Sequence, residues 1–385
     1  MNSIKPIAIY LPQFHPIPEN DKWWGKGFTE WTNVTKANPL YKGHYQPHLP
    51  ADLGFYDLRL KEARLEQVKL AKEYGIYGFC YYHYWFNGKR LLNEPIDRML
   101  KNPDEDFPFM LCWANENWTR AWDGMTKEVL VEQKYCYEDD INHIRFLLPI
   151  LKDDRYIKIN GKPVFIIYKS ADLPDVKKTI QIWRDEASKV NIELYICRMD
   201  RWNTENGQHI LDFGFDAAIE FQPLGHSLRE FLKKKQDINK NKTSLIILNK
   251  LLNRIRICKK KINLLIEKYM GDQKISRIID MQEFVSFDNN RPLEEYKLYP
   301  CVCPSWDNSP RRKKDSIIFT NSTPEVFYNW MKGKLRKFKP YSKDENLFFI
   351  NAWNEWAEGN HIEPDQKYGR AYLESVQKAI NEIKQ

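Results

Sequence analysis

The chain has 385 residues, of which 42% are hydrophobic, and a formal net charge of +8 at neutral pH. This length is enough for one large hydrophobic core or two ordinary ones, and no apolar run is long enough to predict a transmembrane helix. Residues 1–14 lack the charged start and the small-residue cleavage site of a secretory signal peptide, so their apolar part predicts a first strand instead.

The cysteines point to a reducing compartment. There are seven, an odd number, and no two have the C-x-x-C spacing of a metal or redox pair. Four of them, Cys80, Cys112, Cys197 and Cys301, fall inside predicted strands, where a reduced cysteine packs as a small apolar residue. With the missing signal peptide, this pattern predicts a cytoplasmic protein.

Short apolar runs alternate with stretches of helical periodicity along the chain. This alternation predicts a parallel sheet with crossover helices. The predicted strands are 6–11, 77–82, 109–113, 164–168, 193–198, 217–221, 298–302 and 347–352. The predicted helices are 58–74, a short one near Ile96, 138–151, 176–190, 324–335 and 368–383.

Eight strands, most of them followed by a helix, predict a (β/α)8 barrel that forms a single catalytic domain over residues 1–385. An open, doubly wound sheet is the alternative. It lacks support because the stretch 25–30 has only two glycines and follows a loop rather than a strand, unlike a phosphate-binding turn.

The segment 226–280 departs from this pattern. It holds 15 Lys and Arg against 5 Asp and Glu, so it accounts for the whole net positive charge of the chain. Its leucines and isoleucines alternate with the basic residues, which predicts a basic amphipathic helical insertion. Two interpretations stay open, a helical hairpin that covers the barrel and a peripheral contact with an anionic membrane surface or glycan. We expect no nucleic-acid partner, because aromatic residues for base stacking do not interleave with the basic ones.

The most informative stretch is 346–364, where the last predicted strand runs into two carboxylates, Glu355 and Glu358. They lie among Trp353, Trp356 and amide side chains. An exposed loop tip is the plain explanation for such a pair, but loop tips rarely contain two tryptophans. A sugar site needs flat apolar walls beside carboxylates that transfer protons, and cleavage of a glycosidic bond uses two acidic residues. We therefore predict that Glu355 and Glu358 are catalytic.

The other predicted strand ends supply candidate contacts to an oligosaccharide or polysaccharide substrate. Two of them, Glu116 and Glu220, could hold sugar hydroxyls or could be structural, salt-bridged glutamates. The full set of candidates is Tyr10, Gln13, Glu30, Trp31, His83, Trp85, Trp113, Asn115, Glu116, Trp118, Glu220, Trp306, Trp353 and Asn354.

Motifs for metals and cofactors are missing from the sequence. His44 and His48 flank Pro47, which prevents a helical ligand pair, and there is no zinc-protease motif, nucleophile elbow or Walker loop. The acidic triplet 104–106 resembles those that hold metal–nucleotide complexes in some transferases. It precedes a strand rather than following one, so a solvated turn is the better interpretation. We predict no cofactor and no metal site.

Several motifs together resemble the WbsX-type proteins, which are related to the endo-α-mannosidases and endomannanases of glycoside hydrolase family 99. The resemblance covers residues 4–375 apart from the basic segment. It rests on AIYLPQFH at 8–15, GFTEW at 27–31, WANENW at 113–118, EWAEG at 355–359 and IEP at 362–364.

The resemblance implies a (β/α)8 barrel and a retaining reaction on α-linked sugars. In family 99 the first glutamate of the motif is thought to deprotonate the sugar 2-hydroxyl, giving a 1,2-anhydro sugar, and the second acts as the acid/base. These roles fall on Glu355 and Glu358. Ala357 stands where the hydrolases often have histidine, which bears on the sugar subsites more than on the chemistry.

WbsX-type members are commonly described as glycosyltransferases because they occur with O-antigen and capsule synthesis. Bacterial surface polysaccharide metabolism is therefore the expected context. One alternative is a transferase that uses nucleotide-linked or lipid-linked sugars at the inner membrane surface, with segment 226–280 on the membrane. Another is a glycan-binding module without catalytic activity.

Overall fold

The computed structural model describes residues 4–120, 125–202, 204–241, 277–312 and 315–384. Its centre is a ring of parallel strands in the order β12-β10-β9-β8-β4-β2-β1-β15-β13. β12 and β13 are separated by Pro300 alone, so they are two halves of one strand, and the ring is closed apart from this break. The strands of the ring are β1 (Lys5–Tyr10), β2 (Gly78–Phe86), β4 (Phe109–Trp113), β8 (Lys162–Ile167), β9 (Tyr195–Asp200), β10 (Ala217–Glu220), β12 (Leu298–Tyr299), β13 (Cys301–Val302) and β15 (Leu347–Ile350).

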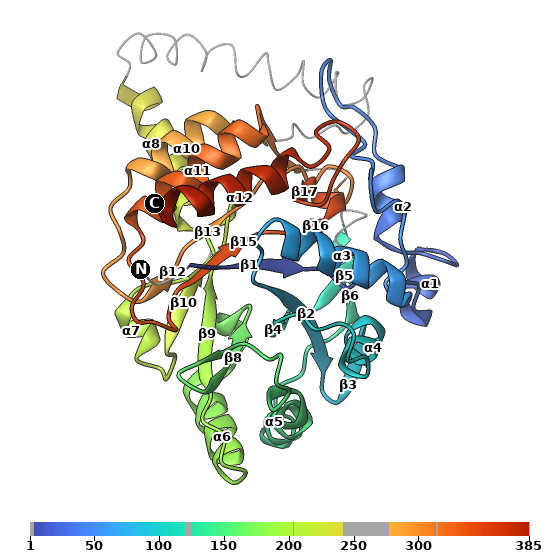
Figure 1. The fold of residues 1–385 in the computed structure, drawn as a ribbon, viewed down its shortest axis with the longest axis vertical. Helices are drawn as coiled ribbons and strands as arrows, with labels where there is room; N and C mark the ends of the chain where they lie inside the picture. The colour runs from blue at the N-terminus through green and yellow to red at the C-terminus, as the bar shows by residue number, and fades with distance from the viewer. Residues whose placement is uncertain (1–3, 121–124, 203, 242–276, 313–314, 385) are drawn as a thin grey trace, which may run out of the picture.

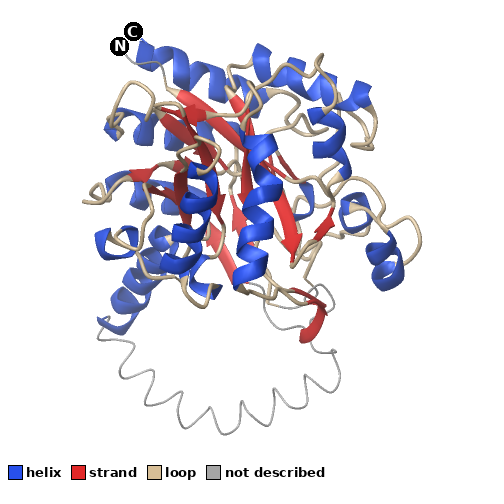
Figure 2. Cartoon of the chain, turned by 90° about the horizontal axis from the view of Figure 1, so that it is seen from below, coloured by secondary structure: helices blue, strands red, loops and turns tan. Residues whose placement is uncertain are grey.

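Helices surround this ring, as Figures 1 and 2 show. Their buried side chains recur at helical spacing, for example Ile144, Leu147 and Leu151 in α5. The helices are α1 (Pro18–Trp24), α2 (Glu30–Thr35), α3 (Lys61–Glu73), α4 (Glu94–Leu100), α5 (Tyr137–Leu151), α6 (Val176–Ser188), α7 (Gln208–Leu211), α8 (His226–Asn241), α10 (Met281–Asn290), α11 (Pro324–Lys337) and α12 (Ala371–Lys384).

The barrel wall is apolar because both of its faces are covered. The last five residues of β1 and all of β2, β4 and β15 are buried, and strands covered on both faces are continuous apolar runs. β1 pairs with β2 on one side and with β15, the last strand of the ring, on the other. The two ends of the chain therefore lie close together (Figure 2).

The predicted (β/α)8 barrel is confirmed, and the predicted strand 109–113 matches β4 residue for residue. The predicted strand 298–302 is divided, because Pro300 has no N–H to donate to a neighbouring strand. Its carbonyl still accepts a bond from the N–H of Phe349, with an N–O distance of 2.8 Å. The single-domain assignment over 1–385 stays a prediction.

Several short elements were not predicted, because two to seven residues carry too little periodicity. The antiparallel pairs are β5 (Trp118–Arg120) with β6 (Met125–Val131), β16 (Asn354–Glu355) with β17 (Asn360–His361), β3 (Lys89–Leu91) with β2, and β7 (Lys158–Ile159) with β8. A parallel pair joins β11 (Arg277–Asp280) to β14 (Ile317–Thr320). Single turns of 3-10 helix, η2 (Ser170–Asp172) and η3 (Trp356–Glu358), follow β8 and β16.

The basic segment 226–280 is described at both ends. It starts with the helix α8, in which Leu228 and Phe231 are buried, and the Phe231 ring packs on Phe284 of α10. The last four residues correct the helical prediction, because they form β11 and pair with β14. The rest of the predicted helical insertion, 242–276, lies outside the described residues. In the part of the chain that is described, every helix is too short or too polar to cross a bilayer.

The barrel wall has no room for a side chain at Gly78, the first residue of β2. A Cβ atom there would lie 2.6 Å from the carbonyl oxygen of Pro108 and 2.9 Å from Cδ1 of Ile157. The same carbonyl accepts a hydrogen bond from the N–H of Phe79, so it cannot move freely.

We predict that Gly78→Ala lowers the free energy of unfolding by about 1–3 kcal/mol, because the added methyl group overpacks the wall. Urea unfolding followed by circular dichroism measures this change. Lys69→Ala, at an exposed ion pair, is the control and is expected to change stability by less than about 0.5 kcal/mol. Equal stabilities of the Gly78→Ala variant and the wild type would contradict the packing described here.

Candidate active site

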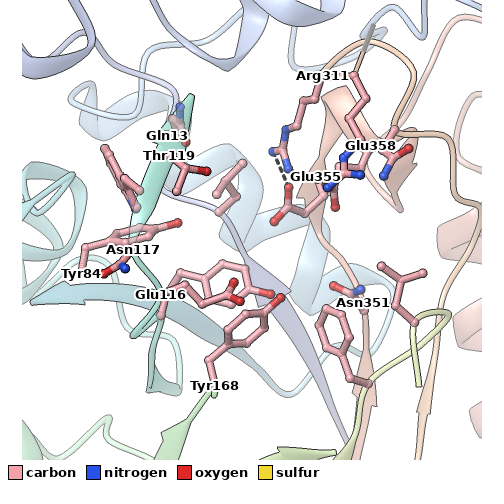
Figure 3. A pocket seen from close by; sticks show the side chains of 18 of the residues that line it. Gln13, Tyr84, Glu116, Asn117, Thr119, Tyr168, Arg311, Asn351, Glu355 and Glu358 are labelled. Atoms are coloured by element: carbon pink, nitrogen blue, oxygen red, sulfur yellow. Dashed lines mark hydrogen bonds and ion pairs between the residues drawn. The ribbon is translucent and has the colours of Figure 1, made fainter. Parts of the chain in front are cut away.

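The C-terminal ends of the wall strands open into a cavity of about 340 Å³, where (β/α)8 barrels carry their active sites. Figure 3 shows it from close by. The lining residues come from α1, from the ends of β1, β2, β4, β8, β9 and β10, from β5, β6, β16 and η3, and from the loops after β13 and β15. They are Leu11, Gln13, Asn20, Trp24, Tyr82, Tyr84, Ala114, Glu116, Asn117, Trp118, Thr119, Leu130, Tyr168, Arg201, Phe221, Leu224, Trp306, Asn308, Arg311, Arg312, Asn351, Glu355 and Glu358.

Aromatic rings and side-chain amides make up much of this lining. The rings are those of Trp24, Tyr82, Tyr84, Trp118, Tyr168, Phe221 and Trp306, and the amides are Gln13, Asn20, Asn117, Asn308 and Asn351. Flat apolar faces suit the C–H faces of a pyranose ring, and amides can both donate and accept hydrogen bonds with hydroxyls. The walls therefore suit a neutral, polyhydroxylated ligand.

Glu355 and Glu358 both lie in this cavity. Glu355 ends β16, and Glu358 ends the 3-10 turn η3 that follows. The turn closes at Gly359, whose φ of +56° is a left-handed conformation that favours glycine. A Cβ atom at this position would lie 3.3 Å from side-chain atoms of Asp307 and His48. The position of Glu358 thus depends on a residue without a side chain.

The guanidinium of Arg311, in the loop after β13, joins the two carboxylates. Its Nη2 lies 2.6 Å from Oε2 of Glu355 and its Nη1 lies 2.9 Å from Oε1 of Glu358. A third carboxylate, that of Glu30 on α2, accepts a hydrogen bond of 2.9 Å from Nε and another from Nη2. Because the two nitrogens belong to one planar group, the nearest oxygens of Glu355 and Glu358 are at most about 8 Å apart, near enough for both carboxylates to contact one sugar.

Burial sets the protonation of this cluster. It raises the pKa of Glu355 to about 8, against the positive charge of Arg311 and with the help of the negative charges of Glu358 and Glu30. Burial also raises the pKa of Glu30. A carboxyl group with a pKa near neutrality can take up or release a proton during a reaction, which an ordinary exposed glutamate does less readily.

A third glutamate of the motif, Glu363, binds a residue of the η3 turn. Its carboxylate accepts hydrogen bonds from Nε1 of Trp356 at 2.6 Å, from the Tyr56 hydroxyl at 2.7 Å and from Nε2 of Gln67 at 2.7 Å. Burial raises its pKa to about 7. Because all three donors converge on one carboxylate, Glu363 fixes Trp356, the residue between the two candidate catalytic glutamates.

Asp307 ties neighbouring loops to the same turn. Its N–H donates to the carbonyl of Glu358, and its carboxylate accepts bonds of 2.6 Å from the side chains of His44 and Gln46. These bonds hold the pKa of Asp307 below its usual value, although burial acts in the opposite direction. The loops after β1, β13 and β15 therefore form one connected wall.

The predicted site residues fall into three groups. Gln13, Glu116, Trp118, Trp306, Glu355 and Glu358 line the cavity. Four others do not line the cavity but contact residues that shape it. Glu30 binds Arg311, and Trp31 packs on Trp356. Asn115 binds the backbone of Lys169, next to Tyr168, and Asn354 binds the backbone of Leu11. Tyr10, His83, Trp85, Trp113, Glu220 and Trp353 lie elsewhere.

The residues of this third group are buried in contacts that occupy their polar atoms or rings. The Tyr10 hydroxyl donates to Gln67, His83 lies 3.0 Å from His143, and Nε1 of Trp85 donates to Asp139. Trp113 packs on Trp183, and Trp353 packs on Phe79. Neighbouring side chains of a strand point to opposite faces, so a place near a strand end does not by itself bring a side chain into the cavity.

Of the two glutamates with an open role, Glu116 lines the cavity and Glu220 does not. Glu116 lies 2.9 Å from Nη1 of Arg201. Glu220 is a buried member of an ion network with Lys334 and Asp288, and it lines a second cavity with α11. Glu220 therefore has the salt-bridged surroundings that the structural alternative describes.

Five residues that line the cavity were not predicted as site residues from the sequence: Arg311, Arg201, Tyr82, Tyr84 and Tyr168. Arg311 belongs to a basic loop, and its spacing to the glutamates carries no motif. One available signal was charge balance, because buried acidic residues require a cation or hydrogen-bond donors. Several glutamates near tryptophans therefore indicate that a basic residue from elsewhere in the chain neutralises them.

Within the described ranges, one group of side chains could approach metal-binding geometry: His48, His361 and Asp365, whose ligand atoms lie within 4.8 Å of one another. Nδ1 of His48 lies 3.0 Å from Nε2 of His361, and Nδ1 of His361 lies 3.0 Å from the carbonyl of Glu363. This chain of contacts matches two neutral rings joined by a hydrogen bond. Burial lowers the pKa of His48 to about 3, in keeping with a neutral ring.

We predict that Glu355→Gln changes how stability depends on pH. The carboxyl group of Glu355 keeps its proton in the folded state up to about pH 8, whereas an ordinary glutamate loses it near 4.5. Its contribution to the free energy of unfolding therefore falls as pH rises from about 4.5 to 8, by up to about 1.4 kcal/mol per pH unit. Urea unfolding between pH 5 and pH 9 should show the variant gaining stability relative to the wild type as pH rises. The exposed substitution Glu374→Gln is the control, and a constant difference for Glu355→Gln would contradict the raised pKa.

Comparison with known proteins gives the family. The family model described as "Glycosyltransferase WbsX" matches residues 6–376. The protein named "Uncharacterized protein WxcX" from two strains of Xanthomonas campestris pv. campestris is 37% identical over 376 residues, which is 97% of this chain and 49% of the relative. The chain thus spans about half the length of these relatives.

Solved structures give the same fold. A "Glycoside hydrolase-like protein" has a TM-score of 0.56 at 14% identity, covering 99% of this chain and 94% of its own. The GH99 endo-alpha-mannosidase from Bacteroides thetaiotaomicron has a TM-score of 0.57 at 12% identity, covering 98% of this chain and 97% of its own. Identity this low indicates a shared fold only. The family match over nearly the whole length shows that the chain belongs to the WbsX glycosyltransferase family.

Proposed function

We propose that the protein cleaves or transfers an α-linked glycan with retention of anomeric configuration, through Glu355 and Glu358. One observation carries the proposal: both carboxylates contact a single guanidinium at the edge of a cavity walled by aromatic rings and amides. Two carboxylates beside one bound sugar are the machinery of glycosidic bond cleavage. The family membership and the fold shared with a GH99 endo-alpha-mannosidase support a carbohydrate-active enzyme.

The proposed reaction has two steps. Glu355 takes the proton of the sugar 2-hydroxyl while O2 attacks C1, the bond from C1 to the leaving oxygen breaks, and Glu358 gives its proton to that oxygen. In the second step Glu358 takes a proton from water, the water oxygen attacks C1, the C1–O2 bond breaks, and O2 recovers its proton from Glu355. Two inversions at C1 give retention. Another sugar hydroxyl in place of water would make the same reaction a transfer.

The environment of each glutamate supports this division of roles. The side chain of Glu355 is 7% exposed and that of Glu358 is 19% exposed. The raised pKa of Glu355 makes its carboxylate a stronger base, which suits a proton acceptor for a weakly acidic hydroxyl. The more exposed Glu358 is better placed to exchange protons with a leaving group and with water. We propose surface polysaccharide metabolism as the context, in line with the family.

We predict that Glu355→Gln and Glu358→Gln each lower kcat by about 10²- to 10⁴-fold, because each removes a proton-transfer group. The assay measures the release of reducing ends from α-mannose-type and α-rhamnose-type oligosaccharides and from α-glycosyl fluorides. The control is Glu374→Gln, an exposed glutamate on α12. Wild-type turnover by both catalytic-site variants, on a substrate that the wild type consumes, would refute the assignment. Binding without turnover across the whole panel would favour a glycan-binding module.

A second candidate is transfer from a nucleotide-linked or lipid-linked sugar at an anionic membrane surface. The basic character of segment 226–280 favours it. Lys233, Lys234 and Lys235 on α8 are exposed at the described start of this segment. Juxtamembrane lysines each contribute about 1 kcal/mol of attraction to anionic lipids.

We therefore predict that replacing Lys233, Lys234 and Lys235 by glutamate weakens co-sedimentation with phosphatidylglycerol-containing vesicles by at least about tenfold. The exposed lysines Lys69, Lys72 and Lys101, replaced in the same way, form a matched control with equal net charge. Equal weakening by both triple variants would show a general charge effect, and no weakening by either would remove α8 from any membrane contact.

A further inference from the structure

Among the described residues, Arg311 is the cation that contacts both candidate catalytic carboxylates, and it makes more than an ordinary ion pair. The three acidic partners come from distant parts of the chain, with Glu30 on α2, Glu355 on β16 and Glu358 in η3. The guanidinium itself is held in the loop after β13. A single side chain thus connects α2, β16 and η3.

The bonds use the whole fork of the arginine. Nε and Nη2 face Glu30, Nη2 also reaches Glu355, and Nη1 reaches Glu358. A guanidinium is planar and rigid, so these bonds fix direction as well as distance. They engage Oε2 of Glu355 and Oε1 of Glu358.

Glu30 has a place in this arrangement although it does not reach the cavity. The side chain of Glu30 is fully buried, and it forms an ion pair with Arg311. Burying a carboxylate without a cation or several donors is unfavourable, and two bonds to one arginine orient that arginine. Glu30 therefore acts on the site through Arg311.

Charge explains why the arginine matters for the chemistry. Burial and the carboxylates of Glu358 and Glu30 disfavour a negative charge on Glu355. Arg311 opposes them directly, and Arg312 also lines the cavity. The cation at 2.6 Å favours the charged form of Glu355, which is the form that can accept a proton.

We propose that Arg311, oriented by Glu30, is a positioning residue that favours the charged form of Glu355 and sets its place relative to Glu358. The use of both carboxylates in one reaction rests on the proposed function. The ionisation of Glu355 does not, because it can be measured on the protein alone. The first experiment below therefore decides on Arg311 even if the reaction proves to be a different one.

The first experiment measures the titration of Glu355 by paired variants. The pH dependence of urea-unfolding stability is compared between the wild type and Glu355→Gln, and again between Arg311→Met and the double variant Arg311→Met/Glu355→Gln. Each difference reports Glu355 alone, and it levels off where Glu355 becomes ionised in the folded state. We expect this point to move upward by about 1–3 pH units without Arg311. An unchanged point would overturn the proposal.

Two further variants separate charge from geometry and from general destabilisation. Arg311→Lys keeps the charge without the fork, so we expect a titration close to that of the wild type with kcat lowered about tenfold or more and little change in KM. Arg64→Met breaks another buried arginine–glutamate pair, with Glu105, and is expected to lower stability without moving the titration of Glu355. A shift of equal size in Arg64→Met would show a non-specific effect and would also overturn the proposal.

Should Arg311→Met fail to fold, Arg311→Ala with added guanidinium ion replaces it. The added ion can occupy the vacated position, so we expect it to bring the titration of Glu355 back toward that of the wild type and to raise kcat several-fold where turnover is measurable. Equal concentrations of sodium salt control for ionic strength. No difference between guanidinium and sodium would count against a positioning role for Arg311.

Discussion

The site depends on one physical constraint, that a carboxylate withdrawn from water needs compensation. The protein compensates its buried acids in different ways. Glu355 shares the guanidinium of Arg311, Glu363 accepts three hydrogen bonds from uncharged donors, and Glu220 pairs with the ammonium of Lys334. The first arrangement places a carboxylate at the cavity, whereas Glu363 and Glu220 are bound away from it.

The barrel supplies the frame in which this compensation is possible. Parallel strands with both faces covered bring eight loops to one end, and the loops are then tied to one another. Asp307 bonds the loop after β13 to the turn of Glu358 and to the long loop after β1. Because these ties use buried, short polar contacts, the walls around the two glutamates are largely preformed. A preformed site loses less conformational entropy when a ligand binds.

Much of the fold was predictable, and the reason is periodicity. Apolar runs such as 109–113 and the helical pattern at 138–151 predict β4 and α5 closely, and their alternation predicts the barrel. Glu355 and Glu358 were predictable because a local motif holds them together. The interruption at Pro300 and the short pair β16–β17 were not predictable, since both depend on partners distant in the sequence.

The directions of side chains and the identity of the central cation were also beyond the sequence. His83 lies near the end of a strand, yet its ring packs against His143. Arg311 stands 281 residues from Glu30 along the chain, so no spacing rule relates them. Local pattern therefore identifies the acids of this site, and only the tertiary fold identifies what neutralises them.

The pairing of β1 with β15 has a consequence for synthesis of the protein on the ribosome. Lys5 lies opposite Leu347 in this pair, so the barrel wall is incomplete until nearly the whole chain has emerged. Glu30 is synthesised long before Arg311, and both are synthesised before Glu355 and Glu358. The cluster of Glu30, Arg311, Glu355 and Glu358 therefore forms only after residue 358 has been synthesised, in a single late step.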